Sequence, residues 1–186
     1  MRKIINSTYV SLDGVVEQPQ RWSSAYFQDE AGAYARDLLF SCGALLMGRR
    51  TFDGFSQAWP AMRDAAGDFG VRMNTLPHYV GSDSLRQPGW GDTTAIRRAD
   101  AVAEITRLKD RDGLDILQYG FGPVSRTLVE HGLLDELRLW IHPVIAGARD
   151  PAHQLARADF AASFELVGTT TFTTGVIIAT YRPAGG

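Results

Sequence analysis

Apolar and polar residues follow two different periods along this chain, and the two periods alternate for about two-thirds of its length. Short runs that are rich in β-branched residues, or apolar throughout and bounded by glycine, predict strands. Apolar positions three or four residues apart predict helices. The predicted strands cover residues 2–10, 44–48, 79–82, 93–96, 114–119, 135–144, 164–172 and 176–181. The predicted helices cover residues 27–41, 50–57, 100–109 and 123–130.

This order of elements predicts an α/β fold in three layers. The central sheet is expected to be mostly parallel, with an antiparallel hairpin at the C-terminal edge. Residues 60–75 show no clear period, and the second helix is expected to end at Trp59-Pro60, because the residue before a proline is pushed out of the helical region. We expect a single domain over residues 1–183 and a tail over residues 184–186, since no linker or repeat interrupts the chain.

A first glycine junction, Gly48-Arg49-Arg50-Thr51, joins an apolar strand to the start of a helix. The helix start presents unpaired N–H groups and the positive end of the helix dipole, and the side chains beside it add two guanidinium groups and a hydroxyl. Arginine binds phosphate through planar, paired donors. The junction therefore suits a phosphate, although a solvated basic helix start explains the local sequence equally well.

A second glycine junction follows a later strand at Tyr119-Gly120-Phe121-Gly122-Pro123-Val124. Pro123 suits the first position of a helix, where its missing N–H costs nothing. A Rossmann fingerprint would need a third glycine where Ser125 stands, so we do not predict a Rossmann fold. We predict instead a second turn that contacts a dinucleotide. Ligands of open α/β sheets bind beyond the carboxyl ends of the strands, and both junctions lie at such ends.

Length and composition limit the classes of function. A chain of 186 residues with 45% hydrophobic and 22% charged residues suits one globular domain. Its net charge of −2 gives no electrostatic case for binding nucleic acid or a membrane surface. No apolar run approaches the roughly 20 residues that span a bilayer. The 4 histidines have no ligand spacing, so no metal site is expected, and the single cysteine, Cys42, is expected in the core.

Four motifs, in their order and spacing, resemble those of the dihydrofolate-reductase-like superfamily. They are most similar to the reductase half of the riboflavin-biosynthesis deaminase-reductase. The motifs are Ser11-Leu12-Asp13-Gly14, Leu46-Met47-Gly48-Arg49-Arg50-Thr51-Phe52, Gly120-Phe121-Gly122, and Gly132-Leu133-Leu134-Asp135-Glu136-Leu137-Arg138-Leu139 leading to His142-Pro143-Val144. The resemblance covers nearly the whole chain and implies the three-layer αβα fold of that superfamily. It also implies an NADPH-dependent reductase of a pterin-like or aminopyrimidine substrate, such as 5-amino-6-(5-phosphoribosylamino)uracil.

The resemblance also implies the residues that bind the cofactor. Around the first junction, the adenosine 2′-phosphate and the pyrophosphate would be held by Gly48, Arg49, Arg50 and Thr51, with Ser82 near the 2′-phosphate. Around the second junction, the nicotinamide and pyrophosphate track would be lined by Gly120, Phe121, Gly122 and Val124. Relatives often carry an arginine where this chain has Asp83, and a carboxylate there would repel a phosphate. Preference for NADPH over NADH therefore stays open.

Hydride transfer also needs a source for the proton that the substrate gains. Asp13, beside the end of the first strand, is one candidate, and its alternative is a turn residue that bonds its own backbone. Glu30 or Asp29 in the first helix is another candidate, and helix starts favour acids for structural reasons alone. Asp135 and Glu136 belong to the shared motifs, but we expect them to cap a strand or support an oligomer contact rather than catalyse.

Three aromatic residues, Trp22, Tyr26 and Phe27, are candidates for stacking on a planar heterocyclic substrate, with packing against the core as the alternative. Three functions stay open: a reductase of the riboflavin or folate type, a reductase of another small carbonyl or imine, and a non-catalytic NADP(H)- or pterin-binding protein. We expect a cytoplasmic protein. We also expect a homodimer, because Leu139 and Ile141 are predicted to be exposed on a late strand.

Overall fold

The computed structural model describes residues 1–147, 150–156 and 160–184. Its strands are β1 (Ile4–Ser11), β2 (Cys42–Gly48), β3 (His78–Gly81), β4 (Thr93–Ile96), β5 (Asp115–Tyr119), β6 (Glu136–His142), β7 (Phe164–Thr171) and β8 (Ile177–Pro183). Its α-helices are α1 (Asp29–Phe40), α2 (Arg49–Met62), α3 (Gly67–Thr75), α4 (Ala101–Asp110) and α5 (Pro123–Glu130). Short 3-10 helices are η1 (Pro19–Arg21), η2 (Ser24–Tyr26), η3 (Arg98–Asp100) and η4 (Pro151–His153).

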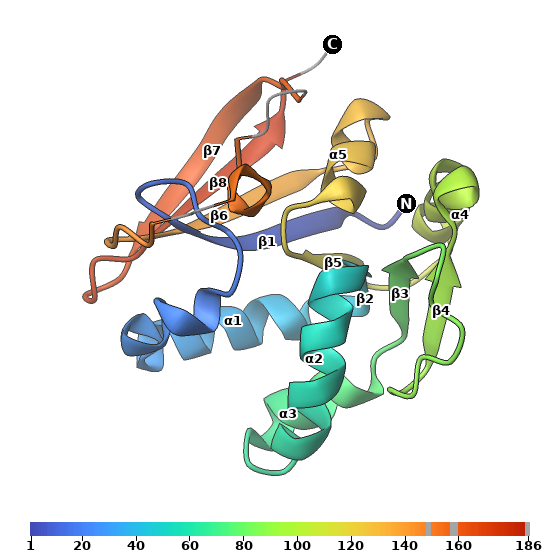
Figure 1. Ribbon diagram of the computed structural model, residues 1–186, viewed down its shortest axis with the longest axis horizontal. Coiled ribbons are helices and arrows are strands. Elements are labelled where there is room, and N and C mark those ends of the chain that lie inside the picture. Colours follow the sequence, from blue (N-terminus) through green and yellow to red (C-terminus); the bar gives the residue numbers. More distant parts are fainter. Residues whose placement is uncertain (148–149, 157–159, 185–186) are drawn as a thin grey trace.

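All eight strands form one sheet in the order β4-β3-β2-β5-β1-β6-β8-β7. The pairings from β4 to β6 are parallel, and the pairings of β8 with β6 and with β7 are antiparallel. The predicted fold class, a mostly parallel sheet with an antiparallel C-terminal hairpin, is therefore confirmed. β5 lies between β1 and β2, so the ends of these three strands meet at the centre of the sheet (Figure 1).

Two cores explain the three layers, because successive side chains of a strand point to opposite faces of the sheet. Ile4, Leu46 and Ile116 pack on the face covered by α4 and α5. Their chain neighbours, Ile5, Leu45 and Leu117, pack on the face covered by α1, α2 and α3 (Figure 1). Central strands that are apolar on both faces are therefore required by the fold. No helix of the described residues is long and apolar enough to cross a membrane.

The prediction that α2 ends at Trp59-Pro60 is wrong, because the helix continues through Pro60 to Met62. Tertiary packing holds this last turn. The Trp59 ring lies 6.1 Å from that of Phe55 and 5.5 Å from that of Phe69 in α3. The unassigned residues 60–75 contain α3, whose buried residues are Gly70 and Met73. A Cβ at Gly70 would collide with the end of α2, so a glycine is needed where the two helices meet.

The late strand also differs from its prediction, because Leu139 and Ile141 are half-buried rather than exposed. β6 is flanked on both sides, by β1 and by β8, and Leu139 packs against the core under α4 and α5. The exposed apolar side chains lie one and two strands further out, at Ile177 in β8 and at Leu166 and Val167 in β7. The apolar surface of this part of the sheet is therefore near its edge.

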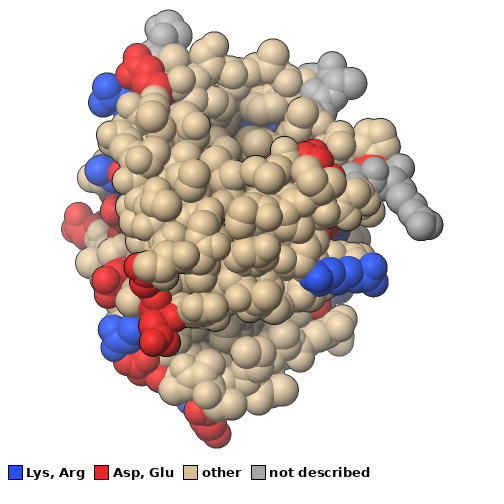
Figure 2. Space-filling view, turned by 90° about the vertical axis from the view of Figure 1, so that its left-hand side faces the viewer, with Lys and Arg blue, Asp and Glu red and all other residues tan. Residues whose placement is uncertain are grey.

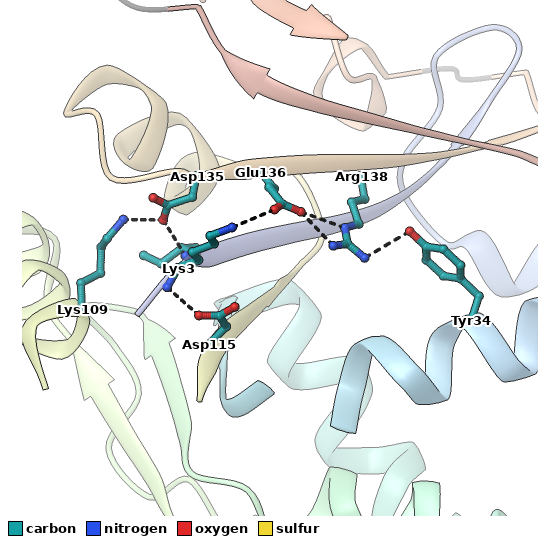
Figure 3. A network of polar contacts seen from close by, with 8 residues as sticks. Lys3, Tyr34, Lys109, Asp115, Asp135, Glu136 and Arg138 are labelled. Carbon is teal, nitrogen blue, oxygen red and sulfur yellow. Dashed lines mark hydrogen bonds and ion pairs between the residues drawn. The ribbon is translucent and has the colours of Figure 1, made fainter. Parts of the chain in front are cut away.

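A polar network ties together the amino ends of the central strands (Figure 3). Asp135 accepts a hydrogen bond from the backbone N–H of Ile4 (2.7 Å) and another from Lys109. The Lys109 ammonium is 6% exposed and also donates to the carbonyl oxygen of Leu133 (2.8 Å). A buried charge is tolerated when it is paired and hydrogen-bonded, so Asp135 has a structural role.

Glu136 extends this network across the sheet (Figure 3). Its carboxylate lies 3.6 Å from the Lys3 ammonium and 2.8 Å from the Arg138 guanidinium. Arg138 also donates to the hydroxyl of Tyr34 in α1 (3.2 Å). Both acids of the shared motif thus cap and connect strands at the end of the sheet opposite the glycine junctions.

Candidate active site

The two glycine junctions converge. β2 and β5 are neighbouring parallel strands, so the starts of α2 and α5 face the same edge of the sheet. A Cβ at Gly48 would lie 3.8 Å from a methyl group of Val124, and a Cβ at Gly81 would lie 2.5 Å from the same methyl group. Val124 of the second junction therefore packs directly over the ends of β2 and β3.

Gly120 makes the closest approach between the junctions. Its φ of +77° is a left-handed conformation that residues with a Cβ rarely adopt. A Cβ there would lie 2.7 Å from the hydroxyl oxygen of Thr51 in the first turn of α2. Glycine is thus required for two independent reasons, and the predicted residues Thr51 and Gly120 are neighbours.

Buried polar side chains behind the second junction fix its shape. Asn6 and Gln118 both donate to the carbonyl oxygen of Gly120, at 2.9 and 2.7 Å. The Ser125 hydroxyl donates to the same carbonyl (3.0 Å) and accepts from the N–H of Gly122 (3.2 Å). Every partner in such a network restricts the backbone, so the turn is preorganised. Sequence reasoning missed Asn6 and Gln118, although polar residues at two adjacent central strands are a usable signal.

The arginines of the first junction are paired but open to solvent. The Arg49 guanidinium lies 2.7 Å from Asp53 and donates to the hydroxyl of Ser84 (3.1 Å). The Arg50 guanidinium lies 3.5 Å from Glu17 in the loop after β1, and its side chain is 68% exposed. Exposed ion pairs contribute little, about 0–1 kcal/mol, so an anion can replace these carboxylates at little cost.

The turn after β3 presents a hydroxyl rather than a repelling charge. Ser82 accepts hydrogen bonds from the backbone N–H groups of Ser84 (3.3 Å) and Leu85 (3.1 Å). Asp83 is engaged with η3, since its carboxylate accepts from the N–H of Arg98 (2.9 Å) and lies 4.0 Å from the guanidinium of that residue. The negative charge of Asp83 is thus compensated locally.

Of the three candidate proton donors, Asp13 and Glu30 accept hydrogen bonds from other groups of the protein, and Asp29 is exposed at the start of α1. Asp13 accepts hydrogen bonds from the Ser11 hydroxyl (2.6 Å) and from the N–H groups of Ala146 (2.9 Å) and Gly147 (2.7 Å). These bonds, the one from Ser11 first, lower the pKa of Asp13 to about 2. The side-chain and backbone donors of Thr173, at 2.5 and 2.7 Å, likewise lower the pKa of Glu30. As catalytic residues both stay predictions, and their contacts favour structural roles.

The predicted stacking residues divide into two groups. Trp22 and Tyr26 lie edge-on to the buried ring of His142, with centroids 5.3 and 5.8 Å away. The Nδ1–H of His142 donates to the carbonyl oxygen of Trp140 (2.8 Å), and burial lowers the pKa of His142. Phe27 does not join this cluster. It is 50% exposed and lies over Gly32, at 3.9 Å from the position of a Cβ there.

Two further tyrosines lie near the second junction and were not identified from the sequence. Tyr9 in β1 packs against Trp140 (5.0 Å) and His142 (4.8 Å). Tyr119, the last residue of β5, packs against Phe55 of α2 (5.3 Å). A tyrosine within a predicted strand is ordinarily a core residue, so no sequence signal set these two apart.

The surface around these loops carries little charge. Figure 2 views the molecule from the side of the β1–α1 loop and the β7–β8 hairpin, and uncharged side chains cover the middle of this face. Two exposed apolar residues of the loops that follow β1 and β6 are Leu12 and Ile145, which are 60% and 70% exposed. A groove of about 610 Å³ opens beside Trp22, with Arg21 and His153 on its walls. In the described part of the chain, no cluster of His, Cys, Asp and Glu could hold a metal ion.

Comparison with known proteins places this geometry in a family. The family model described as the RibD C-terminal domain matches residues 2–178. The uncharacterized protein YyaP of Bacillus subtilis (strain 168) is 31% identical over 97% of this chain and 95% of its own length. The chain belongs to the RibD C-terminal domain family.

Solved structures support the RibD C-terminal domain fold. A putative riboflavin biosynthesis protein from Shewanella sp. PV-4 is similar over 100% of both chains, with a TM-score of 0.67 and 18% identity. The Thermotoga maritima deaminase/5-amino-6-(5-phosphoribosylamino)uracil reductase has a TM-score of 0.64 and 14% identity, with 98% of this chain matched to 57% of that one. The resemblance inferred from the motifs is thereby confirmed, and the family is that of a riboflavin-biosynthesis reductase domain.

Proposed function

We propose that this protein is a cytoplasmic NADPH-dependent reductase of a planar heterocycle of the pterin or aminopyrimidine type. The observation that carries the proposal is the convergence of the two glycine junctions, which brings the starts of α2 and α5 to one edge of the sheet. The glycines at positions 48 and 120 leave the backbone at both strand ends without side chains, which suits a dinucleotide that approaches the backbone closely. The single cysteine, Cys42, is buried and free, in keeping with a reducing compartment.

The residues at these junctions fit NADPH. Arg49, Arg50 and Thr51 would bind the phosphates at the start of α2, with Ser82 beside the 2′-phosphate. The contact of Asp83 with Arg98 reduces the repulsion that would otherwise disfavour that phosphate. The turn from Gly120 to Gly122, together with Val124, would line the path toward the nicotinamide, which supplies the hydride when it is bound.

The substrate would lie beside the aromatic side chains at the carboxyl ends of β1 and β5. Trp22 and Tyr26 are placed there by the loop before α1, and Phe27 lies further out. The Thermotoga maritima relative is named as a 5-amino-6-(5-phosphoribosylamino)uracil reductase, which supports a heterocycle of that kind here. Because Asp13 and Glu30 are held as carboxylates, water is the simplest source of the proton.

Thermal unfolding with NADPH and with NADH tests this function. A ligand at 100 times its Kd stabilises the native state by about 2.7 kcal/mol, which raises Tm measurably. We expect a larger rise with NADPH than with NADH. Arg50→Gln should reduce the NADPH shift and leave the NADH shift nearly unchanged, because the guanidinium is assigned to phosphate binding. Arg182→Gln is the control, since Arg182 pairs with Glu165 at the sheet edge.

Two results would contradict the proposal. If neither cofactor raises Tm at millimolar concentration, the proposed reductase function is contradicted. If NADPH and NADH raise Tm equally, and Arg50→Gln changes neither rise, the assignment of Arg50 to the 2′-phosphate of NADPH is contradicted. A second candidate function is a reductase of another small carbonyl or imine on the same scaffold. It is favoured by one observation: Asp13 and Glu30, two of the carboxylates predicted for the proton donor, are already engaged by hydrogen-bond donors of the protein.

A further inference from the structure

Two tyrosines occupy matched positions on neighbouring strands beside the second junction. β1 and β5 are parallel and adjacent, and Ser7 of β1 pairs with Tyr119 of β5. Tyr9 lies two residues beyond Ser7, so the two-residue period of a strand places Tyr9 and Tyr119 on the same face of the sheet as diagonal neighbours. This is the face covered by α1 and α2, and Tyr119 directly precedes Gly120.

The rings of both tyrosines are fixed by aromatic neighbours. Tyr9 contacts Trp140 and His142, and Tyr119 contacts Phe55, with centroid distances between 4.8 and 5.3 Å. Trp22 of the loop before α1 contacts the same His142 ring. The tyrosines therefore stand in the neighbourhood where the stacking residues gather, and their orientation is set by packing rather than by hydrogen bonds.

Their hydroxyl groups are not used by the protein. Neither the Tyr9 nor the Tyr119 hydroxyl forms a hydrogen bond with any residue within 1–147, 150–156 or 160–184, and both side chains are only partly exposed. In contrast, the Tyr34 hydroxyl accepts from Arg138 at 3.2 Å. The buried side-chain atoms that lack a hydrogen-bond partner in the described residues are Nε of Arg72 and Oγ1 of Thr174, so the hydroxyl oxygens of Tyr9 and Tyr119 reach solvent. Two hydroxyls on neighbouring strands that solvent reaches and that no described residue engages are free to bind a ligand.

The ionisation of the two phenols fits a donor role. Burial raises the pKa of Tyr9, and burial followed by interaction with Tyr9 raises the pKa of Tyr119. Both groups stay neutral at physiological pH and keep the O–H that donates a hydrogen bond. A phenol with a raised pKa is a poor acid, so these groups bind and polarise rather than transfer a proton.

We propose that Tyr9 and Tyr119 form the polar part of the substrate site and donate hydrogen bonds to an edge of a neutral planar heterocycle that carries carbonyl oxygens or ring nitrogens. The inference rests on the proposed function and specifies the recognition within it. Trp22 and Tyr26 would stack on the ring of the substrate. The hydroxyls of Tyr9 and Tyr119 would select heterocycles that carry hydrogen-bond acceptors on the edge facing them. Rings without such acceptors leave both hydroxyls unpaired and bind weakly.

The test compares single variants that remove only a hydroxyl. Pterin (2-amino-4-hydroxypteridine) and 5,6-diaminouracil are titrated into the full chain with NADP⁺ present, and Kd is measured for Tyr9→Phe and Tyr119→Phe. We expect each variant to weaken binding of at least one probe about fivefold, as for loss of one neutral hydrogen bond. Tm and the NADPH-induced rise in Tm should be unchanged. Tyr181→Phe is the matched control, because Tyr181 packs in the core on the opposite face of the sheet.

The outcomes separate this inference from the proposed function. Unchanged Kd values in both variants, or no binding of either probe to a protein that binds NADPH, overturns the tyrosine assignment and leaves the cofactor assignment. Heterocycle binding that depends on the tyrosines in a protein that NADPH does not stabilise supports the site and overturns the reductase function. Failure of the wild-type protein to bind either cofactor or probe overturns both.

Discussion

Asp13 and Glu30 are residues of the type that acid catalysis uses, yet each is surrounded by donors that keep it ionised. Tyr9 and Tyr119 present the opposite case, because their polar atoms have no partner among the described residues. The difference matters because a side chain with all its hydrogen bonds made within the protein has little to offer a ligand. At the residue scale, availability of the polar atom is a better guide to the site than residue type.

The role of Asp13 can be tested through pH. Its folded-state pKa of about 2 lies below the ordinary value of 3.8, so its contribution to stability is present above that value and is lost as pH falls toward 2. We expect Asp13→Asn to be less stable than the wild type near neutral pH, with a difference that shrinks between about pH 4 and pH 2. Urea unfolding across this range measures it, with the exposed Asp112→Asn as control. A difference independent of pH would contradict the assigned hydrogen bonds.

At the scale of elements, the close approach of Gly120 to Thr51 couples the two junctions. Gly120→Ala introduces a Cβ in a left-handed conformation, at about 1–2 kcal/mol, and adds a collision with the Thr51 hydroxyl of similar cost. The double variant with Thr51→Ala removes the collision and leaves the conformational cost. Denaturant unfolding should therefore show the double variant to be more stable than Gly120→Ala alone. Strictly additive losses would mean that the junctions do not touch.

The elements differ in how far the sequence specifies them. The strand ends at Gly48 and Gly120 are predictable, because a glycine between an apolar run and a helical pattern is a local signal. The end of α2 is not predictable from the local sequence, because Trp59 and Pro60 remain helical through tertiary contacts with α3. Tyr9 and Tyr119 are likewise invisible locally, since the lack of a partner for a hydroxyl depends on everything packed around it.

At the scale of the whole molecule, the sheet ends in an exposed edge. Nearly every residue of β7 is exposed, and Leu166 and Val167 are 58% and 59% exposed. An exposed strand with apolar side chains favours association with another chain. We propose that the homodimer expected from the sequence forms through β7 and β8 rather than through Leu139 and Ile141.

Sedimentation of charged variants tests the dimer. Leu166→Lys and Val167→Lys together should convert a dimer into a monomer, because a symmetric interface would then bury ammonium groups of like charge from both protomers. Leu114→Lys is the control, since Leu114 is 54% exposed and directly precedes β5, four strands away from β7 in the sheet order. A wild-type protein that sediments as a monomer, or a dimer unaffected by the double variant, would contradict this assignment.

The position of β1 in the sheet has a consequence for synthesis of the chain. β1 is made first, but its partners are β5 and β6, which begin at Asp115 and Glu136. An emerging chain that has completed β1 to β4 therefore holds its first strand without a hydrogen-bonded neighbour, and β2 is paired only with β3. Pairing between such distant segments is slow, and unpaired strand edges are prone to aggregate. Folding of the central sheet must wait until the later strands leave the ribosome, so we expect the nascent protein to depend on chaperones until β5 is inserted.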